Sequence, residues 1–559
     1  MTGPIIVCGI GDVGYQVVEL LHRLGEPVVV VAERIDEERR LALEDRKIPI
    51  LLGNARNERL LLETGLESAQ ALITVTDKDL VNIEIALDAR RLRPDLPIVL
   101  RLFDQDLARQ VESALDVRRA LGMSALAAPS FAAAAMGDSV LASFTLGGIP
   151  FVVGRKLVGD SRLGRCPNAA AVSRFFRLQT LLRERPGEGC AFLPGGGEPL
   201  QPGDRLSLLG RKKDWDRCFG TAETPADPSE RSSWRHSLAN RLRRAVRTWN
   251  EEPLPLRILF ASICLLIPAA VLFFRYFLGF TLTDAIFYTT ITLHGEIGLT
   301  DTLPEVKLYE VLVMILGSVT VATLYSMITD YVVSSRLRKI LGGRPMPKRG
   351  HVLVVGMGHV GFRTLRELTR LGVPAVAIDV NPDTALLANA RTLAPVVTGD
   401  ARSGELLAQA GLATATAVVA ATSDDAVNLS VALTARRLNP RIRTVLRLFD
   451  DEFARKVESA LGIDSALGAS WIAAPTFAAS VLYPDVARAV IVQDQLLVFL
   501  ERKAGDWAGL KPSELRAEQG IHVLLRGGEP VAADEKPLEA GEEILAALCR
   551  SLAPDWAER

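Results

Sequence analysis

Short apolar runs alternate with amphipathic segments in both the N-terminal and the C-terminal parts of the chain. The runs PIIVCG, PVVVVAE and ALITVT lie in the first part, and HVLVVG, PAVAID and AVVAAT lie in the last. Strands that are apolar throughout are buried on both faces, as they are in a parallel sheet covered by helices. The pattern therefore predicts α/β Rossmann-like domains, each with a doubly wound parallel sheet.

The two parts are copies of one domain. Residues 91–137 and 437–483 share the strings VLRLFD and VESAL in register, at an offset of 437 minus 91, or 346 residues. The strings AAPSFAA and AAPTFAA follow at the same offset. A repeat of this length indicates that one structural unit is used twice.

Two uncharged stretches, residues 258–274 and 311–329, separate the copies. At roughly 1.5 Å per residue each stretch, completed by its less polar flanks, crosses a hydrocarbon layer of about 30 Å. We therefore expect two transmembrane helices, with a pair of buried core helices as the alternative. Arginine-rich segments at 235–247 and 334–349 flank the pair, whereas the loop between the stretches is acidic. This distribution predicts a multi-pass membrane protein with both termini in the cytoplasm.

The segment before the first stretch has its own pattern. Trp234, Leu238, Leu242 and Trp249 recur at helical spacing, and the five arginines between them lie mostly around the other faces of such a helix. This is typical of a basic helix lying on the inner leaflet of a membrane. A solvated linker helix is the alternative, because a linker rich in Pro and acidic residues at 221–230 precedes it.

Each copy contains a G-x-G-x-x-G turn that follows a strand and opens a helix. An acid, Glu33 or Asp379, stands at the end of the next strand. Glycines let the backbone approach a diphosphate, the helix N-terminus carries partial positive charge, and the acid binds ribose hydroxyls. We therefore expect an adenine nucleotide, either NAD(H) or ADP/ATP, and disfavour a ribose with a 2′-phosphate. Arg34, directly after Glu33, weakens that preference in the first copy.

Two further segments of each copy are expected at the same edge of the sheet: a G-N/D-A segment and a strand end carrying Thr and Asp. Strand-terminating turns and helix caps are the alternative for these residues. The candidate nucleotide-binding residues are Gly9, Gly11, Asp12, Val13, Gly14, Glu33, Gly53, Asn54, Ala55, Thr76 and Asp77 in the first copy, and Gly356, Gly358, His359, Val360, Gly361, Asp379, Gly399, Asp400, Ala401, Thr422 and Asp424 in the second. We interpret His359 as a helix-start surface residue. Asp12 places a carboxylate near the diphosphate, so the second site is expected to be the occupied one if only one is filled.

Composition excludes several classes of function. The net charge is -1, with 65 Lys plus Arg and 66 Asp plus Glu, so no global field favours nucleic acid. The six cysteines form no C-x-x-C pair and the six histidines show no ligand spacing, which argues against a disulfide scaffold, a zinc module and a catalytic centre. The N-terminus runs directly into a strand without a basic n-region, so it is not expected to be a signal peptide.

Taken together, the glycine turns, the G-N/D-A segments, the Thr-Asp strand ends and the R-L-F-D strand expected to close each sheet resemble the RCK (regulator of potassium conductance) or Trk-type NAD-binding domain. The segments at 200–214 and 538–552 are similar to the hallmark turn of the small α+β C-terminal subdomain of that family. The middle of the chain resembles a two-transmembrane potassium-channel pore, with 280–292 as the pore helix and 328–342 as the exit of the inner helix.

The resemblance implies a division of the chain and an assembly. The parts are a first RCK N-lobe at 1–137 and its C-terminal subdomain at 138–218, a linker and interfacial helix at 219–256, an all-α pore domain at 257–340, and a second N-lobe at 350–483 with its subdomain at 484–559. Such channels are homotetramers in membrane lipid that pass a monovalent cation. Two regulators in each of four chains supply the eight domains that close a gating ring. Its ligands are commonly a small nucleotide or a divalent cation such as Ca²⁺.

The chain departs from the family where selectivity is made. In place of T-V-G-Y-G, the candidate filter is Thr292, Leu293, His294, Gly295, Glu296, Ile297 and Gly298. Potassium selectivity therefore does not carry over from the resemblance. Glu296 forms a ring of four carboxylates or lies in the outer mouth, and His294 is a hydrogen-bonding strut or a proton-sensitive group.

The sequence leaves three hypotheses. A ligand-gated cation channel accounts for all parts of the chain. A non-conducting, membrane-anchored nucleotide sensor accounts for the altered filter. An NAD-dependent oxidoreductase accounts for the glycine turns alone, but it requires a substrate domain with an acid or base, and only short subdomains follow the turns.

Overall fold

The structure is a computed structural model. It describes residues 3–103, 105–137, 140–146, 149–159, 162–219, 254–293, 303–340, 344–531 and 536–553. The chain divides into two compact units, one formed by Met1–Thr221 with Gly343–Arg559 and the other by Ala222–Gly342. The expected interfacial helix and the filter residues from His294 to Gly298 lie outside the described residues.

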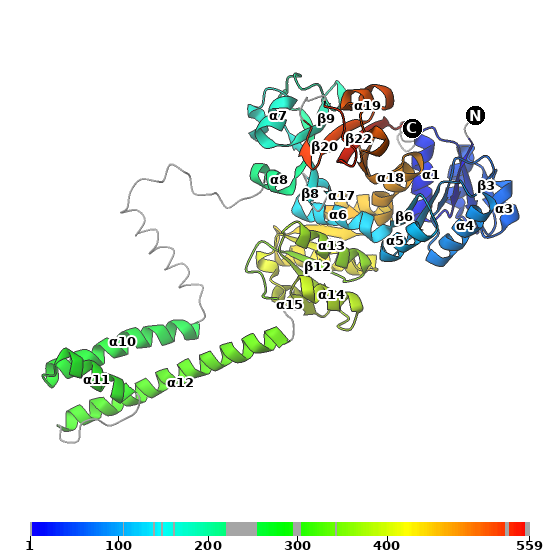
Figure 1. Cartoon of the computed structure of the whole chain (residues 1–559). Coiled ribbons are helices and arrows are strands. Elements are labelled where there is room, and N and C mark those ends of the chain that lie inside the picture. Colours follow the sequence, from blue (N-terminus) through cyan, green and yellow to red (C-terminus); the bar gives the residue numbers. More distant parts are fainter. Residues whose placement is uncertain are drawn as a thin grey trace. The chain divides into compact units, whose positions relative to one another are not determined.

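The first lobe is a six-stranded parallel sheet with the order β3-β2-β1-β4-β5-β6, and the reversal of strand order falls between β1 and β4 (Figure 1). Its strands are β1 (Ile5–Cys8), β2 (Val28–Ala32), β3 (Ile50–Leu52), β4 (Ala71–Thr74), β5 (Ile98–Leu102) and β6 (Arg119–Gly122). Its helices are α1 (Asp12–Arg23), α2 (Glu37–Asp45), α3 (Glu58–Glu63), α4 (Asp79–Leu92), α5 (Gln105–Ala114) and α6 (Met123–Met136). The apolar runs form buried central strands, as their composition predicted.

The second lobe repeats this topology, with the strand order β14-β13-β12-β15-β16-β17. Its strands are β12 (Val352–Val355), β13 (Ala375–Asp379), β14 (Val396–Thr398), β15 (Ala417–Ala420), β16 (Arg443–Arg447) and β17 (Ser465–Leu467). Its helices are α13 (His359–Arg370), α14 (Ala385–Leu393), α15 (Gly404–Gln409), η3 (Leu412–Thr414), α16 (Asp425–Leu438), α17 (Asp451–Leu461) and α18 (Ala469–Leu482). Two Rossmann-like domains with parallel sheets are therefore confirmed.

One detail of the expected topology is wrong. The R-L-F-D strand does not close either sheet, because β6 pairs with β5 and β17 pairs with β16 on the outer side. These edge strands are short, at four and three residues, and follow an amphipathic helix. Strands this short leave little periodic signal in a sequence.

A five-stranded antiparallel sheet follows each lobe, with the orders β10-β9-β11-β8-β7 and β18-β19-β22-β20-β21. The first subdomain consists of β7 (Val140–Leu146), β8 (Ile149–Leu157), η1 (Arg162–Arg165), α7 (Ala169–Phe176), β9 (Gln179–Arg185), β10 (Gly189–Phe192), β11 (Arg205–Arg211) and α8 (Lys212–Phe219). The second consists of β18 (Val486–Val492), β19 (Gln495–Lys503), η4 (Gly505–Trp507), α19 (Pro512–Gln519), β20 (His522–Arg526), β21 (Glu529–Pro530) and β22 (Glu543–Ser551). The two sheets share one core, in which Phe151 and Leu182 lie in a cluster with Phe499 and Leu545.

An ion pair fixes the turn before the last long strand of each subdomain. Arg185 donates two hydrogen bonds, of 2.8 and 2.9 Å, to the carboxylate of Asp204, whose side chain is 1% exposed. Arg526 donates two of 2.8 Å to Glu542 in the second copy. These bidentate pairs explain why the G-D and G-E turns recur in the sequence.

The two lobes exchange helices. Helix α6 of the first lobe packs against α13 of the second, and α18 of the second packs against α1 of the first; Figure 1 shows α6 beside α13. Phe131 on α6 belongs to the same core cluster as Val360 and Leu365 on α13. Phe477 on α18 belongs to the core of the first lobe, together with Val17 on α1. Each lobe is thus completed by a helix of the other.

The second unit contains three described helices, α10 (Leu254–Phe277), α11 (Leu282–Leu293) and α12 (Pro304–Ile340). The rings of Phe273 and Tyr309 stack with centroids 3.6 Å apart and join α10 to α12. Leu293, the last residue of α11, lies so close to α12 that a Cβ added to Gly317 would be 2.7 Å from its Cδ2 atom. Among the described residues, the segment Pro304–Ser326 of α12 is long and apolar enough to cross a membrane, whereas Ile263–Phe277 of α10 is apolar but shorter.

Candidate functional site

The two glycine turns have the same geometry. Gly9 and Gly356, directly after β1 and β12, adopt φ angles of +107° and +87°, a region that favours glycine. The third glycines allow close packing, because a Cβ on Gly14 or Gly361 would lie 2.0 or 1.8 Å from the carbonyl oxygen of the first glycine. Both turns therefore need glycine at their first and third positions for the fold itself.

The second glycines are different. Gly11 and Gly358 precede α1 and α13 with φ angles of -65° and -73°, which any residue can adopt, and a Cβ added there would meet no atom within 4 Å. Folding does not require glycine at these positions. Open space before a helix N-terminus is what the close approach of a diphosphate requires.

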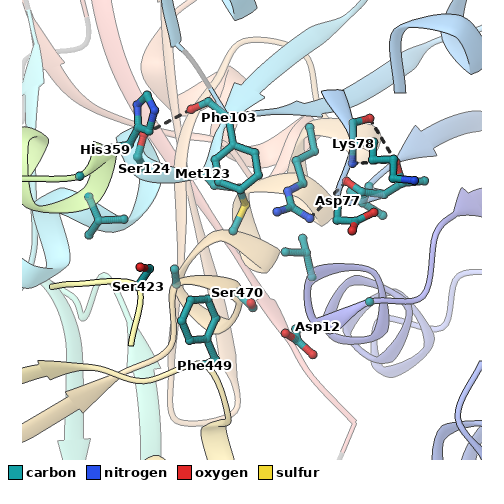
Figure 2. A pocket seen from close by; sticks show the side chains of 18 of the residues that line it. Asp12, Asp77, Lys78, Phe103, Met123, Ser124, His359, Ser423, Phe449 and Ser470 are labelled. Atoms are coloured by element: carbon teal, nitrogen blue, oxygen red, sulfur yellow. Dashed lines mark hydrogen bonds between the residues drawn. The ribbon is translucent and has the colours of Figure 1, made fainter. Parts of the chain in front are cut away.

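Both turns open into one cavity of about 910 Å³ between the lobes. Figure 2 shows side chains of both lobes around it, among them Asp12 and Phe103 from the first lobe and His359 and Phe449 from the second. One of the dashed lines marks the hydrogen bond that Ser124, at the start of α6, donates to the carbonyl of Phe103. The start of α6, with Met123 and Ser124, lines the cavity. Because α6 packs against α13, this part of the lining contacts the helix that follows the second glycine turn.

The two ribose acids are held differently. The Asp379 carboxylate accepts a hydrogen bond of 2.5 Å from the Met357 amide in the second glycine turn and one of 2.9 Å from the Asn381 amide. Glu33 is exposed at the end of β2 and lines the cavity. The Asp379 carboxylate is therefore held in a fixed position beside the second glycine turn.

Asp12 is ion-paired. Its carboxylate lies 2.7 Å from Nη2 of Arg39 on α2, and Nη1 of Arg39 donates 3.1 Å to the Ile10 carbonyl inside the turn. The expectation that Asp12 disfavours the first site rested on an uncompensated carboxylate. The structure supplies a compensating cation.

The G-N/D-A segments also differ in charge. Asp400 pairs with Arg402, which holds the pKa of the carboxyl below its usual value mainly through side-chain hydrogen bonds. Asn54 accepts from the backbone amide of Arg56, and Arg56 pairs with Glu84 instead. Both segments line the cavity at the ends of β3 and β14.

The strand-end threonines are fixed by buried asparagines that the sequence analysis did not single out. Asn82 accepts from the amide and hydroxyl of Thr76, at 2.9 and 2.8 Å, and Asn428 does the same for Thr422 at 2.9 and 2.7 Å. Both amides are fully buried. The sequence did carry a signal for these asparagines, because Asn82 and Asn428 recur at the repeat offset of 346 residues.

Most of the candidate residues meet in the cavity. Those that line it are Gly9, Gly11, Asp12, Val13, Glu33, Gly53, Asn54, Ala55, Thr76 and Asp77 with Gly356, Gly358, His359, Val360, Asp379, Gly399, Asp400, Ala401 and Thr422. Gly14 and Gly361 lie behind the turns. Asp424 is not in the lining and caps α16 by accepting from the Val427 amide, whereas the residue equivalent to Asp77 is Ser423, which does line the cavity.

Of the candidate filter, the structure describes Thr292 and Leu293, which lie at the end of helix α11. Thr292 is buried, its hydroxyl donates 2.8 Å to the Tyr288 carbonyl, and Leu293 ends α11. For divalent cations, the described residues contain no group of three or more His, Cys, Asp or Glu side chains suited to a metal ion.

The TrkA-N domain family matches residues 5–120 and 352–468, which are the two lobes. The Trk system potassium uptake protein TrkA of Mycobacterium tuberculosis is 30% identical over 200 residues, which cover 35% of this chain and 90% of that protein. Potassium channel protein 1 of Methanocaldococcus jannaschii is 26% identical over 256 residues, covering 43% of this chain and 76% of the relative. An uncharacterized protein of Methanothermus fervidus is 26% identical over 215 residues, and the chain spans only 32% of its length.

Among solved structures, the GsuK channel matches with a TM-score of 0.51 at 15% identity, over 98% of this chain and 77% of that one. At this identity the match concerns the fold. The chain belongs to the RCK/Trk family of potassium-transport proteins, which confirms the family predicted from its motifs. The named relatives are channels and uptake proteins, in keeping with the expectation of a protein that is not an enzyme.

Proposed function

We propose that this protein is a ligand-gated cation channel whose two RCK lobes bind an adenine nucleotide, NAD(H) or ADP/ATP. The observation that carries this proposal is the shared cavity, into which both glycine turns open. The protein would assemble as a homotetramer in the bacterial inner membrane with both termini in the cytoplasm. We also propose that the chain is divided as the sequence predicts, into two N-lobes, each with a C-terminal subdomain, and a linker and pore domain between the two copies.

The residues around each turn fit a nucleotide diphosphate. Gly11 and Gly358 leave the space of a missing side chain in front of a helix N-terminus. Glu33 and Asp379 follow β2 and β13, where a ribose diol would be bound. When bound, the nucleotide supplies the charge and contacts that favour one arrangement of the lobes over another.

The pore is proposed to consist of α10, α11 and α12, with α11 as the pore helix. The close approach of Leu293 to Gly317 supports this arrangement, because it places the end of α11 against the middle of the long helix. The filter that follows would face the permeant monovalent cation, with Glu296 in a ring or at the mouth.

Gating requires a ligand with different affinities for two arrangements of the ring. The exchanged helices connect the cavity to both lobes. Helix α13 begins at the second glycine turn and packs against α6 of the first lobe, whose first residues line the cavity. A shift at one turn is therefore transmitted to the other lobe.

The test is cation flux from proteoliposomes that contain the purified protein, under potassium, sodium and calcium gradients, with and without NAD, NADH, ADP and ATP. We expect flux that changes with nucleotide. The variant Asp379→Asn keeps the acceptor for the Met357 amide but removes the charge, so nucleotide affinity should fall about tenfold. Glu33→Gln is its counterpart in the first lobe.

A non-conducting nucleotide sensor is the second candidate, and the filter sequence that departs from T-V-G-Y-G favours it. Nucleotide binding without flux under any gradient would select the sensor. Unchanged nucleotide affinity in both acid variants would overturn the assignment of the glycine turns.

A further inference from the structure

One surface of the first C-terminal subdomain carries basic side chains without acidic neighbours in the sequence. The segment 162–178, which contains η1 and α7, has four arginines and no Asp or Glu. Arg165, Arg174 and Arg177 are exposed, and the side chain of Phe175 is 68% exposed. We call these four residues the α7 patch. Figure 1 shows α7 beside α8, which is the last described helix before the linker.

The arginines of the patch differ from those on the strands of the same subdomain. Arg155, Arg183 and Arg185 lie on β8 and β9, and each forms an ion pair with a carboxylate, at distances of 3.2, 2.9 and 2.8 Å. Within the described ranges of the chain, the three arginines of the patch form neither an ion pair nor a side-chain hydrogen bond. Their positive charge is therefore available to an external anion.

The second subdomain provides an internal comparison, because α19 is the equivalent of α7. At the local offset of 343 residues (512 minus 169), Phe175 corresponds to Glu518 and Arg177 corresponds to Gly520. The equivalent segment 505–521 contains three acids and two basic residues. Both copies build the same short helix between the same strands. The fold of the subdomain therefore does not require the basic and aromatic side chains of the α7 patch.

The backbone at Arg177 gives an independent indication that its side chain has a role. Arg177 is the C-cap residue of α7 and adopts a left-handed conformation with a φ angle of +56°, and Gly520 at the equivalent position has +64°. This conformation is favourable for glycine and costs free energy for a residue with a Cβ atom. The chain thus carries an arginine where glycine would fold better, which indicates a role of this side chain beyond folding.

We propose that the α7 patch binds the anionic headgroups of the membrane that the apolar helices of this chain enter. Arginines beside an exposed aromatic ring are typical of surfaces that bind at the headgroup level, because the ring enters the interface and the guanidinium groups pair with lipid phosphates. The inference rests on the proposed membrane location of the chain.

The connection of the chain supports a lipid partner over a soluble acidic protein. The linker 220–253 has 34 residues (253 minus 219) and joins the end of α8 to the start of α10. Among the described residues, Pro304–Ser326 of α12 is long and apolar enough to cross a membrane. The patch is therefore tethered to the leaflet by its own chain, and a tether raises the effective concentration of the lipid at the patch. Binding would make the position of the first subdomain depend on the lipid charge of that leaflet.

The experiment is hydrogen–deuterium exchange of the full-length protein in nanodiscs of phosphatidylcholine, with and without phosphatidylglycerol. We expect the backbone amides of α7 to exchange about tenfold more slowly in the anionic discs, because lipid phosphates bound to the arginines stabilise the end of this helix against opening. High salt should remove most of the difference, because the charges lie at the surface. Helix α19 is the internal control and should exchange equally in both kinds of disc.

The matched variant is Arg174→Ala/Phe175→Glu/Arg177→Gly, which gives α7 the residues of α19 at these three positions. It should fold with an unchanged or higher melting temperature, because α19 forms with these residues, and its α7 should exchange equally in both kinds of disc. The variant Arg174→Lys/Arg177→Lys keeps the charge and should keep most of the difference.

Equal exchange of α7 in the unmodified protein would overturn the lipid contact and leave the patch to an acidic protein surface. A difference that persists in the triple variant would overturn the assignment to these side chains. In both cases insertion of the protein into the discs would leave the proposed membrane location intact. Failure to insert would overturn that location together with the lipid contact.

Discussion

The carboxylate of Asp12 and the guanidinium of Arg39 form an ion pair of 2.7 Å at the first glycine turn. Arg39 also donates to the Ile10 carbonyl and lies 5.5 Å from the ring centroid of Tyr15. The pair connects α2 to the start of α1. The first helix can therefore carry an acid at the position where a phosphate is expected.

Removing the cation should weaken the first site selectively. In Arg39→Met the charge of Asp12 is uncompensated, so nucleotide affinity at the first turn should fall by several fold, while Asp12→Asn/Arg39→Met should recover it. The measurement is nucleotide titration in an Asp379→Asn background, which reports on the first site. Equal affinity in the single and double variants would show that the pair does not influence binding.

The second and third glycines of a turn should respond differently to a methyl group. Gly358→Ala should change the free energy of unfolding by less than about 1 kcal/mol, because its Cβ projects into open space. It should abolish nucleotide binding, because the diphosphate needs that space. Gly361→Ala should destabilise the lobe, because its Cβ would lie 1.8 Å from the Gly356 carbonyl oxygen. Thermal unfolding and titration, measured on both variants, separate the two roles. Unimpaired binding by a folded Gly358→Ala would contradict the assignment.

The ion pair of Asp204 with Arg185 should make the first subdomain sensitive to acid. Hydrogen bonds from Arg185 hold the pKa of Asp204 below its usual value. A carboxyl with a lowered folded pKa stabilises the fold above its unfolded pKa of about 3.9, and this stability is lost as the pH falls through the folded pKa. Asp204→Asn should cost about 3 kcal/mol at pH 7.

Urea unfolding between pH 7 and pH 3 measures this effect, and the difference between Asp204→Asn and the unmodified protein should shrink toward pH 3. Glu188→Gln is the control, because Glu188 is a 59% exposed partner of the same arginine. Its loss should cost less than about 1 kcal/mol. A pH-independent difference for Asp204→Asn would rule out the electrostatic origin.

The contact between α6 and α13 contains buried charged side chains. Arg488 on β18 is fully buried, donates 2.9 Å to the Ser130 hydroxyl on α6, and acts electrostatically on the buried Glu367 of α13. In the first copy the equivalent positions are Leu20 and Ala142. Arg488→Met should destabilise the protein by roughly 1–3 kcal/mol, because it removes one of the cations that compensate the Glu367 carboxyl, whose ion pair with Arg370 at 3.4 Å remains.

The double variant Glu367→Leu/Arg488→Met restores the apolar pattern of the first copy and should recover most of that stability. Thermal unfolding of the two single variants and the double variant forms a double-mutant cycle. Additive losses would show that the two side chains are not coupled.

The sequence predicted several of the local segments that line the cavity. The glycine turns, the strand-end acids and the repeat follow from spacing and periodicity, which are properties of consecutive residues. The Asp12–Arg39 pair and the exchange of α6 and α18 depend on segments that meet only in the folded chain. Arg101 and Arg447 were visible within R-L-F-D, but their place in the wall of the cavity is a tertiary property.

The exchange of α6 and α18 has a consequence for biosynthesis. The apolar face of α6 is complete at Met136, but its partner α13 begins only at His359, 223 residues later (359 minus 136). At about 5–20 residues per second, the ribosome needs on the order of tens of seconds to supply that partner, and helices α10, α11 and α12 are made in the interval. During that interval the face of α6 that carries Phe131 lacks its partner, and a chaperone or a neighbouring nascent chain that covers this face would compete with the later lobe for the same surface.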